Sequence, residues 1–446
     1  MHPTGWGSWA FEVADAPLAG DVLSFARGGF QEARGRTKAG AMYIEGIFKE
    51  LDAAEEWYLD EATHTLYYIA PNGTAGLGAD SVVEGTNLAN VIEFRGSSIA
   101  PAAHISLIGF NVSRSAPTFM DSYEMPSGGD WSIHRGGAVF LHGALGITLE
   151  RLVFDQVGGN AVFLSSYARN NSVLNCDFWR IGESAVAAVG VTRGVNGTGE
   201  MYPAFNTISN NHFDTVGVEI KQTSCYFKAK AYANVVSNNV CHDGPRAGIN
   251  FNDGFMGGEV LTENVIWAMV RETGDHGTFN SWDRNEFFYP CADNVSAHAG
   301  ELCLMPTTHD VGGNMFIGPA GWNMDHDDGS SSYHDHDNIV YQGGFKYRDG
   351  IDRVMTGNLM LAGAIPAFQV AGFDTNVFDN NLLDSPGPTC GPQGTKSIEG
   401  NVYFTIANED DANDVSAATD TICDKGTTKA MTVGEVEAVA RKLVGL

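Results

Sequence analysis

The sequence predicts an all-β solenoid, in which one chain coils repeatedly and its strands stack into long parallel sheets. Three observations lead to this prediction. A short pattern, Asn followed by a few apolar residues, recurs at steps that are mostly between 20 and 28 residues. The apolar runs are short, rich in β-branched and aromatic residues, and lack the 3.6-residue rhythm of helices. Gly and Asn gather where such coils need corners.

The recurring Asn keeps a constant phase over eight positions, separated by 28, 25, 50, 24, 20, 23 and 20 residues. A coil of this length cannot bury its inner face alone, so stacked coils should align these residues into a hydrogen-bonded ladder. The 50-residue step shows no second signal, and we predict one coil with a long excursion that Cys291 and Cys303 would staple. The ladder positions are Asn211, Asn239, Asn264, Asn314, Asn338, Asn358, Asn381 and Asn401.

The chain divides into three parts. Residues 1–80 contain EEWYLDEATHTLYY, two aromatic-rich runs around an acidic turn, which predicts a β-hairpin in an N-terminal covering element integrated with the solenoid. Residues 81–405 are predicted to form the solenoid. Phe154 and Phe178 are expected to hold the same place in their coils as Phe213, at spacings of 24 and 35 residues.

Residues 406–446 are predicted to form an acidic loop and a terminal helix. Thr432 and Glu435 have the spacing of a capping box, which favours a helix start. A helix here would cap the solenoid, because open sheet ends invite aggregation. Its apolar face would carry Val436, Val439, Leu443 and Val444.

Composition excludes several classes of function. With 26 basic and 54 acidic residues the net charge is −28, which repels nucleic acid and anionic membranes and weighs against polyanionic sugars. No apolar run approaches the ~18 residues of a membrane span. The seven cysteines form no CxxC pair, so a zinc ribbon is not expected. Five glycosylation sequons suit an extracellular or periplasmic location, and we expect a secretion signal to be absent from this sequence or already removed.

The ladder also assigns positions to acidic residues. Eleven residues beyond three consecutive ladder members lie Asn250, Asp275 and Asp325, which predicts one line along the solenoid wall. Neighbouring parallel strands are ~4.8 Å apart, so the two carboxyls would be roughly 5 Å apart, near the ~5–5.5 Å of retaining glycosidases. Such a pair would split its pKa values into an acid and a nucleophile or base. The structural alternative is an acidic ledge that binds calcium or faces water. Asp327 and Asp328 replace Asp325 if the register slips.

The stretch NMDHDDGSSSYHDHD, which holds Asp325, has other interpretations. An EF-hand fails, because Met324 would be its first ligand. His334 and His336 share a strand face and begin a zinc site, but no third ligand of recognisable spacing joins them. A calcium-assisted polysaccharide lyase remains an alternative. It would use Asp325, Asp327 and Asp328 to hold calcium and Lys346 or Arg348 as the base.

The segments GGDWSIHRGGAVF, GPRAGINFNDG, ETGDHGTFNSWDR and DHDDGSSSY resemble pectin-lyase-like right-handed parallel β-helix proteins. Among these the chain is most similar to the glycoside hydrolase family 141 type, which has fucosidase and xylanase activities. The resemblance covers roughly Trp6 to Phe404. It implies a sugar chain lying across the outer face of one parallel sheet, and hydrolysis by two aspartates, which correspond to Asp275 and Asp325 here.

We therefore predict a glycoside hydrolase that acts on a polysaccharide or oligosaccharide and requires no cofactor, with calcium as the alternative. Trp282 would stack on a sugar ring, and the basic residues would offset the negative surface. A lyase, a non-catalytic glycan-binding or structural protein, and an inactive homologue are the other interpretations. The predicted substrate-binding residues are Asn250, Arg246, Asp253, Glu272, His276, Trp282, Arg284, His326 and Lys346.

Overall fold

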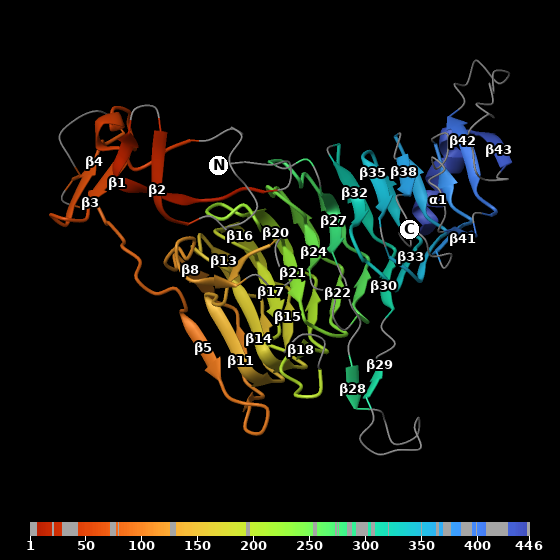
Figure 1. Cartoon of the computed structure of the whole chain (residues 1–446), viewed down its shortest axis with the longest axis horizontal. Coiled ribbons are helices and arrows are strands. Elements are labelled where there is room, and N and C mark those ends of the chain that lie inside the picture. The colour runs from red at the N-terminus through yellow and green to blue at the C-terminus, as the bar shows by residue number, and fades with distance from the viewer. Residues whose placement is uncertain are drawn as a thin grey trace.

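A computed structural model gives the structure of the chain (Figure 1). It describes residues 7–19, 22–28, 43–71, 77–78, 80–124, 131–192, 197–252, 257–272, 274, 276–282, 288–290, 302–304, 308–319, 321–348, 350–362, 365–368, 376–384, 395–397, 399–406 and 427–443.

Three long parallel sheets run along the molecule, and the described coils of the central part each contribute strands to all three sheets, as in a parallel β-helix. Sheet 1 contains β5 (Ile92–Arg95), β6 (Ala102–Ala103), β11 (Val139–Leu145), β14 (Val162–Arg169), β17 (Val186–Val189), β18 (Pro203–Ala204), β21 (Tyr226–Ala229), β24 (Ile249–Asn252), β27 (Gly277–Trp282), β32 (Trp322–His326), β35 (Gly344–Tyr347) and β38 (Ile365–Phe368).

Sheets 2 and 3 follow sheet 1 within each coil. Sheet 2 contains β7 (Ser106–Ile108), β12 (Thr148–Glu150), β15 (Ser172–Leu174), β19 (Thr207–Ser209), β22 (Val235–Ser237), β25 (Val260–Thr262), β30 (His309–Gly312), β33 (Tyr333–His336), β36 (Arg353–Thr356), β39 (Asn376–Asp379) and β41 (Thr395–Ser397). Sheet 3 contains β8 (Asn111–Ser113), β13 (Val153–Asp155), β16 (Asp177–Ile181), β20 (His212–Val216), β23 (Val240–His242), β26 (Val265–Trp267), β31 (Met315–Ile317), β34 (Ile339–Tyr341), β37 (Leu359–Leu361), β40 (Leu382–Leu383), β42 (Val402–Ile406) and β43 (Thr427–Met431).

The core is a continuous apolar column inside the three sheets. Phe154, Phe178 and Phe213 pair in register, and their rings stack with centroids 4.7 and 4.8 Å apart. This confirms the predicted equivalence of the three positions. Each fully buried ring of this size contributes roughly 1.5–3 kcal/mol. A disulfide between Cys225 and Cys241, which the sequence left open, adds a covalent link inside the column.

The predicted Asn ladder is present at the corner between sheets 2 and 3. The backbone N–H and side-chain amide of Asn211 both donate to Oδ1 of Asn239, at 2.9 and 3.0 Å. The same pattern continues from coil to coil as far as Asn401. The residue before each ladder Asn has a positive φ, for example 57° at Glu263 and 66° at Gly313. Asn, Asp and Gly adopt this left-handed conformation most readily, which explains the composition of these corners.

A second ladder, which the sequence analysis missed, lies at the corner between sheets 1 and 2. The amide of Asn171 donates to Asn206 at 2.9 Å, and that of Asn206 donates to Asn234 at 2.8 Å. The last amide donates to the buried carboxyl of Glu259 at 2.9 Å. In the central coils, stacked amides thus hold the corner between sheets 1 and 2 as well as the corner between sheets 2 and 3.

The 50-residue step is a single coil, as predicted. Strand β25 pairs with β30, and β26 pairs with β31, so the intervening chain leaves the solenoid and returns to the next coil. The excursion contains β28 (Phe288–Pro290) and β29 (Leu302–Leu304), an antiparallel pair that projects away from the sheets in Figure 1. Cys291 lies outside the described residues, so the staple to Cys303 stays a prediction.

The N-terminal part forms antiparallel pairs at one end of the solenoid (Figure 1). The predicted hairpin is present: β3 (Trp57–Asp60) pairs with β4 (Thr65–Tyr68) across the acidic turn. The other elements of this region and its border with the solenoid are β1 (Phe11–Ala19), β2 (Val22–Gly28), the 3-10 helix η1 (Phe48–Glu50), β9 (Tyr123–Glu124) and β10 (Ile133–His134).

The C-terminal helix α1 (Val433–Leu443) begins with the predicted capping box. Thr432 Oγ1 accepts the backbone N–H of Glu435 at 3.2 Å, and Glu435 accepts the backbone N–H of Thr432 at 2.8 Å. The apolar side of the helix packs on the outer side of sheet 3, and Val444 lies outside the described residues. The contacting residues are Met315, Ile339, Leu359, Leu361, Leu382, Met431, Val436, Val439, Ala440 and Leu443. In the described part of the chain, no helix has the length and apolar character to span a membrane.

Candidate active site

A row of polar side chains crosses the outer face of sheet 1. Asn250, Asn280, Asp325 and Lys346 are register partners on β24, β27, β32 and β35. Their neighbours along each strand, such as Phe279, belong to the apolar interior, so alternation directs this row outward. The amide of Asn280 donates to Asn250 at 2.7 Å. Of these four residues, the sequence analysis placed Asn250 and Asp325 in one line.

The predicted register of Asp275 is wrong, because Asn280 occupies the place between Asn250 and Asp325. Asn250 and Asp325 follow their ladder asparagines by 11 residues, but Asn280 follows Asn264 by 16. The turn before β27 therefore holds five extra residues, which a count along the sequence cannot detect. The side chain of Asp275 lies outside the described residues, as do those of Asp253 and Arg284.

Asp325 forms a buried ion pair with Lys346. The distance from Lys346 Nζ to Asp325 Oδ1 is 2.7 Å, and the two residues are 3% and 0% exposed. Lys346 Nζ also lies 3.5 Å from Asp327, and Arg348 lies 3.4 Å from Asp327 and 3.0 Å from Asp328. These aspartates already face ammonium and guanidinium groups, so as placed they do not fit the predicted calcium site.

Arg246 and His276 form a second buried contact beside this row. The Arg246 guanidinium contacts His276 Nε2 and lies over the ring of Trp131, with 4.3 Å to the centroid. Burial, together with the positive charges of Arg246 and Lys346, holds the pKa of His276 well below its ordinary value. The imidazole is therefore neutral and accepts a hydrogen bond from the guanidinium. The sequence predicted Arg246 and His276 for this region, but neither Trp131 nor these contacts.

The structure places His326 inside the solenoid. It follows Asp325, so strand alternation turns its side chain inward. Its Nε2 lies 3.0 Å from Asp335 Oδ2, its Nδ1 contacts Ser281 Oγ at 3.1 Å, and Tyr347 donates to the same Asp335 oxygen at 3.0 Å. The Ser, His and Asp types are those of a hydrolytic triad, but all three are fully buried among core rings. The arrangement satisfies buried polar groups. Trp282, predicted to stack on sugar, points outward but is 2% exposed.

A cleft of about 560 Å³ lies between the N-terminal element and the corner turns that connect sheet 3 to sheet 1. Glu219 and Lys221 come from the turn after β20, and Glu272 from the turn after β26. Glu272 was predicted to bind substrate, but the other carboxylates were not identified. The remaining walls combine aromatic rings with further carboxylates: Trp9, Phe11, Phe25, Tyr43, Phe119, Glu12, Glu45 and Glu61.

The cleft carboxylates have different surroundings. Burial, followed by the charge of Glu45, raises the pKa of Glu219, although Lys221 opposes this. Glu272 forms an ion pair with Lys221 at 3.2 Å. Burial and the charges of Glu45, Glu272 and Glu219 also raise the pKa of Tyr43, so these groups interact electrostatically. The cleft therefore holds one carboxyl whose pKa is raised and one that faces a cation, and an acid and a base require two such different environments.

Glu183, at the same corner before β17, predicts a pH effect on stability. Burial raises the pKa of its carboxyl to about 8, and the backbone N–H of His134 donates to it at 3.2 Å. A folded pKa above the unfolded value means that its stabilisation is full below about pH 4.5 and is lost as the pH rises to about 8. The loss is on the order of 5 kcal/mol. We expect Glu183→Gln to flatten the decline in the free energy of unfolding over this range, measured by urea denaturation.

A matched control for this measurement is Glu263→Gln, which changes an exposed corner residue and should leave the pH profile as in the wild type. Burial also raises the pKa of Glu259, to about 7, so part of the decline should persist in Glu183→Gln. Identical pH profiles for wild type and Glu183→Gln would show that Glu183 is not the titrating group.

No family model and no curated protein match the chain. Among solved structures, one named "Glycoside hydrolase" matches with a TM-score of 0.52 and 16% identity, covering 75% of this chain and 57% of that one. Another, "The complex structure of XylC with xylose", has a TM-score of 0.38 and 11% identity, covering 86% and 64%. This chain thus spans little more than half of the first structure, and the resemblance to family 141 stays a prediction. The match to the first structure shows that this chain shares its fold with a protein named as a glycoside hydrolase.

Proposed function

We propose that the protein is a glycoside hydrolase whose substrate binds in the cleft beside the sheet 3 to sheet 1 corner. The observation that carries the proposal is the combination, in one cleft, of aromatic rings with two carboxyls of different environment, Glu219 and Glu272. Aromatic faces stack on sugar rings, and paired carboxyls are what glycoside hydrolysis requires. The fold shared with a glycoside hydrolase supports the same class of activity.

In the proposed reaction, Glu219 is the general acid and Glu272 the general base. The raised pKa of Glu219 keeps its proton available for the departing glycosidic oxygen, while Glu272, paired with Lys221, accepts a proton from the attacking water molecule. The two turns are separated by one intervening coil, because β20 pairs with β23 and β23 with β26. Their backbones are then ~10 Å apart, and side-chain reach shortens this toward the ~6.5–9.5 Å of inverting enzymes.

The substrate proposed is a neutral polysaccharide or its side chains. Glu12, Glu45 and Glu61 line the cleft in addition to the proposed pair, so uronate-rich polymers would meet a negative surface. A polymeric substrate of this kind suits a protein that acts outside the cell or in the periplasm.

The aspartates predicted from the sequence form a second proposal for the catalytic pair. Asp325 lies in the outer row of sheet 1, Asp327 and Asp328 follow it along the chain, and Asp275 is outside the described residues. Asp325 has no exposed surface and is paired with Lys346, so we favour Glu219 and Glu272. The same ion pairs weigh against the calcium-assisted lyase.

A panel of neutral and acidic polysaccharides distinguishes the classes. The hydrolase proposal expects new reducing ends from a neutral polymer, no ultraviolet-absorbing unsaturated product, and no response to added calcium. An unsaturated product that requires calcium would instead show a lyase. Binding to a glycan by affinity electrophoresis, without any product, would show a non-catalytic glycan-binding protein.

A further inference from the structure

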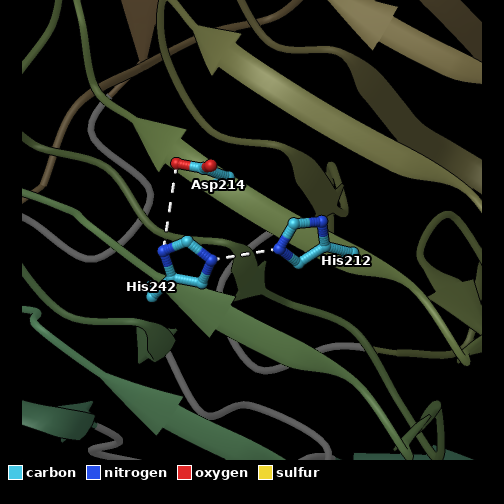
Figure 2. Close-up of side chains that lie close together, drawn as sticks. All are labelled: His212, Asp214 and His242. Atoms are coloured by element: carbon cyan, nitrogen blue, oxygen red, sulfur yellow. Dashed lines mark hydrogen bonds and ion pairs between the residues drawn. The ribbon is translucent and has the colours of Figure 1, made fainter.

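Two histidines meet on the outer side of sheet 3, away from the cleft residues. His212 lies on β20 and His242 on the neighbouring strand β23, and their Nε2 atoms are 3.0 Å apart (Figure 2). Asp214, two residues after His212, is the register partner of His242. One ligand atom from each of the three residues lies within 4.8 Å of the others. Asp214 Oδ1 lies 3.9 Å from His242 Nδ1, the ring nitrogen opposite Nε2, so the carboxylate must turn toward the two Nε2 atoms to complete a coordination shell.

The opposite ring nitrogens face carboxylates. His242 Nδ1 lies 2.8 Å from Asp243 Oδ2, and His212 Nδ1 lies 3.6 Å from Asp177 Oδ1. The carboxylate at His242 Nδ1 favours the tautomer that carries its proton there, which leaves a lone pair on His242 Nε2. The 3.6 Å contact of His212 Nδ1 is too long for a hydrogen bond, so at 3.0 Å the two Nε2 atoms share either a proton from His212 or a cation.

Aromatic contacts fix both imidazoles. The ring of Trp267 stacks on His242 with centroids 4.4 Å apart and an interplanar angle of 16°. Trp179 approaches His212 edge-on at 4.9 Å and 79°. The Thr215 hydroxyl donates to Asp214 Oδ1 at 2.8 Å and holds the third group. The orientation of the cluster is therefore set by neighbours on the same face, as metal ligands require.

We propose that His212 and His242, through their Nε2 atoms, and Asp214, through its carboxylate, bind one zinc ion. Two nitrogens that are each ~2.0–2.1 Å from a tetrahedral zinc are roughly 3.3 Å apart, a few tenths more than observed here. Three protein ligands leave a fourth position for water or an added ligand. The ion would join β20 to β23 across neighbouring coils.

A second cluster offers the same residue types in a different arrangement. Asp310 joins His334 and His336 from the preceding coil, which supplies the third group that the sequence did not reveal. However, His336 Nε2 lies 2.7 Å from Asp310 and its Nδ1 lies 2.9 Å from Asp337. Burial lowers the pKa of His336, but these two carboxylates outweigh it and raise the pKa. Both ring nitrogens of His336 thus face carboxylates already, and the cluster provides a matched control.

Calorimetric titration of the metal-free full chain with zinc chloride tests the site. The wild type should show one saturable zinc site that His212→Ala, His242→Ala and Asp214→Asn each weaken at least ~10-fold, because loss of even a supporting partner has effects of that size. His334→Ala and His336→Ala should leave its affinity unchanged. Cobalt as a replacement probe should give a visible absorption band that the first three variants lose.

The same measurements can overturn the proposal. No saturable zinc site in the wild type would show that the two histidines share a proton. Equal zinc affinity in His212→Ala, His242→Ala and wild type, or a loss confined to the His334 and His336 variants, would place the metal elsewhere. Circular dichroism of each variant identifies any that fail to fold. If the histidine variants do not fold, zinc titration of Asp214→Asn, which keeps both imidazole rings, and the cobalt spectrum test the site.

Discussion

Replacing Glu219 with glutamine will lower kcat/KM for hydrolysis of the cleft substrate ~10²–10⁴-fold, the contribution typical of a general acid. The amide has nearly the same shape but cannot donate a proton to the glycosidic oxygen. The pKa of Glu219 is raised, so wild-type activity should fall as the pH rises through that value, and the variant should lack this limb. Initial rates across pH, on the polymer that the panel identifies, measure both effects.

Glu61→Gln is the matched control, because Glu61 also lines the cleft but takes no part in the proposed chemistry. It should keep near wild-type kcat, whereas Glu272→Gln should lower kcat, because an amide cannot take a proton from the attacking water. Full activity in Glu219→Gln, or an unchanged high-pH limb, would rule out its role as the acid. Loss of activity in Asp275→Asn alone would direct the search to the outer row of sheet 1.

Lys346→Met will lower the free energy of unfolding by ~3–5 kcal/mol, the cost typical of removing one partner of a buried ion pair. The variant keeps a long apolar stem but removes the ammonium that balances the buried carboxylate of Asp325. Urea denaturation measures the change. Asp325→Asn should destabilise the fold for the same reason. The free energy of unfolding of this variant must therefore be measured before a loss of activity is assigned to catalysis.

Arg348→Met is the control for Lys346→Met, because Arg348 directly follows β35, the strand that contains Lys346. Its side chain is 41% exposed and pairs with Asp327 and Asp328 near the surface, so its loss should cost no more than ~1 kcal/mol. The double variant Lys346→Met with Asp325→Leu should recover most of the stability, because apolar groups can replace a buried pair. Equal effects of Lys346→Met and Arg348→Met would contradict this assignment.

The sequence predicted the parts of the fold in which one contact repeats. The Asn ladder recurs from Asn211 to Asn401, and Phe154, Phe178 and Phe213 hold equivalent places in three consecutive coils, so a single phase locates each set. The capping box at Thr432 and the β3–β4 hairpin are equally local, because all their partners lie within a few residues. Local or periodic contacts leave a signal in one sequence.

The candidate site was harder to predict because its parts come from segments without the period. Five extra residues before β27 shifted the register, so Asp275 was aligned where Asn280 lies. The cleft depends on how the non-repeating N-terminal element meets the corner turns, and no count along the chain supplies that geometry. Glu219 carries no motif, and its raised pKa arises from burial and from Glu45, distant in sequence.

The Asn ladder also has a direction. Oδ1 of each ladder Asn accepts from the preceding coil, starting with the Cys176 backbone N–H on Asn211, and the backbone N–H of each Asn donates to the next Asn as far as Asn401. The side-chain amide donates to the next Asn and also to a carbonyl of the preceding coil, as Asn211 does to Val173. Any coil that brings one Asn in phase is therefore bonded to both neighbours, whatever its remaining residues are. The length of this protein can change by whole coils while each surviving contact stays intact. Evolution or design can therefore vary the number of coils while the pattern of ladder contacts stays the same.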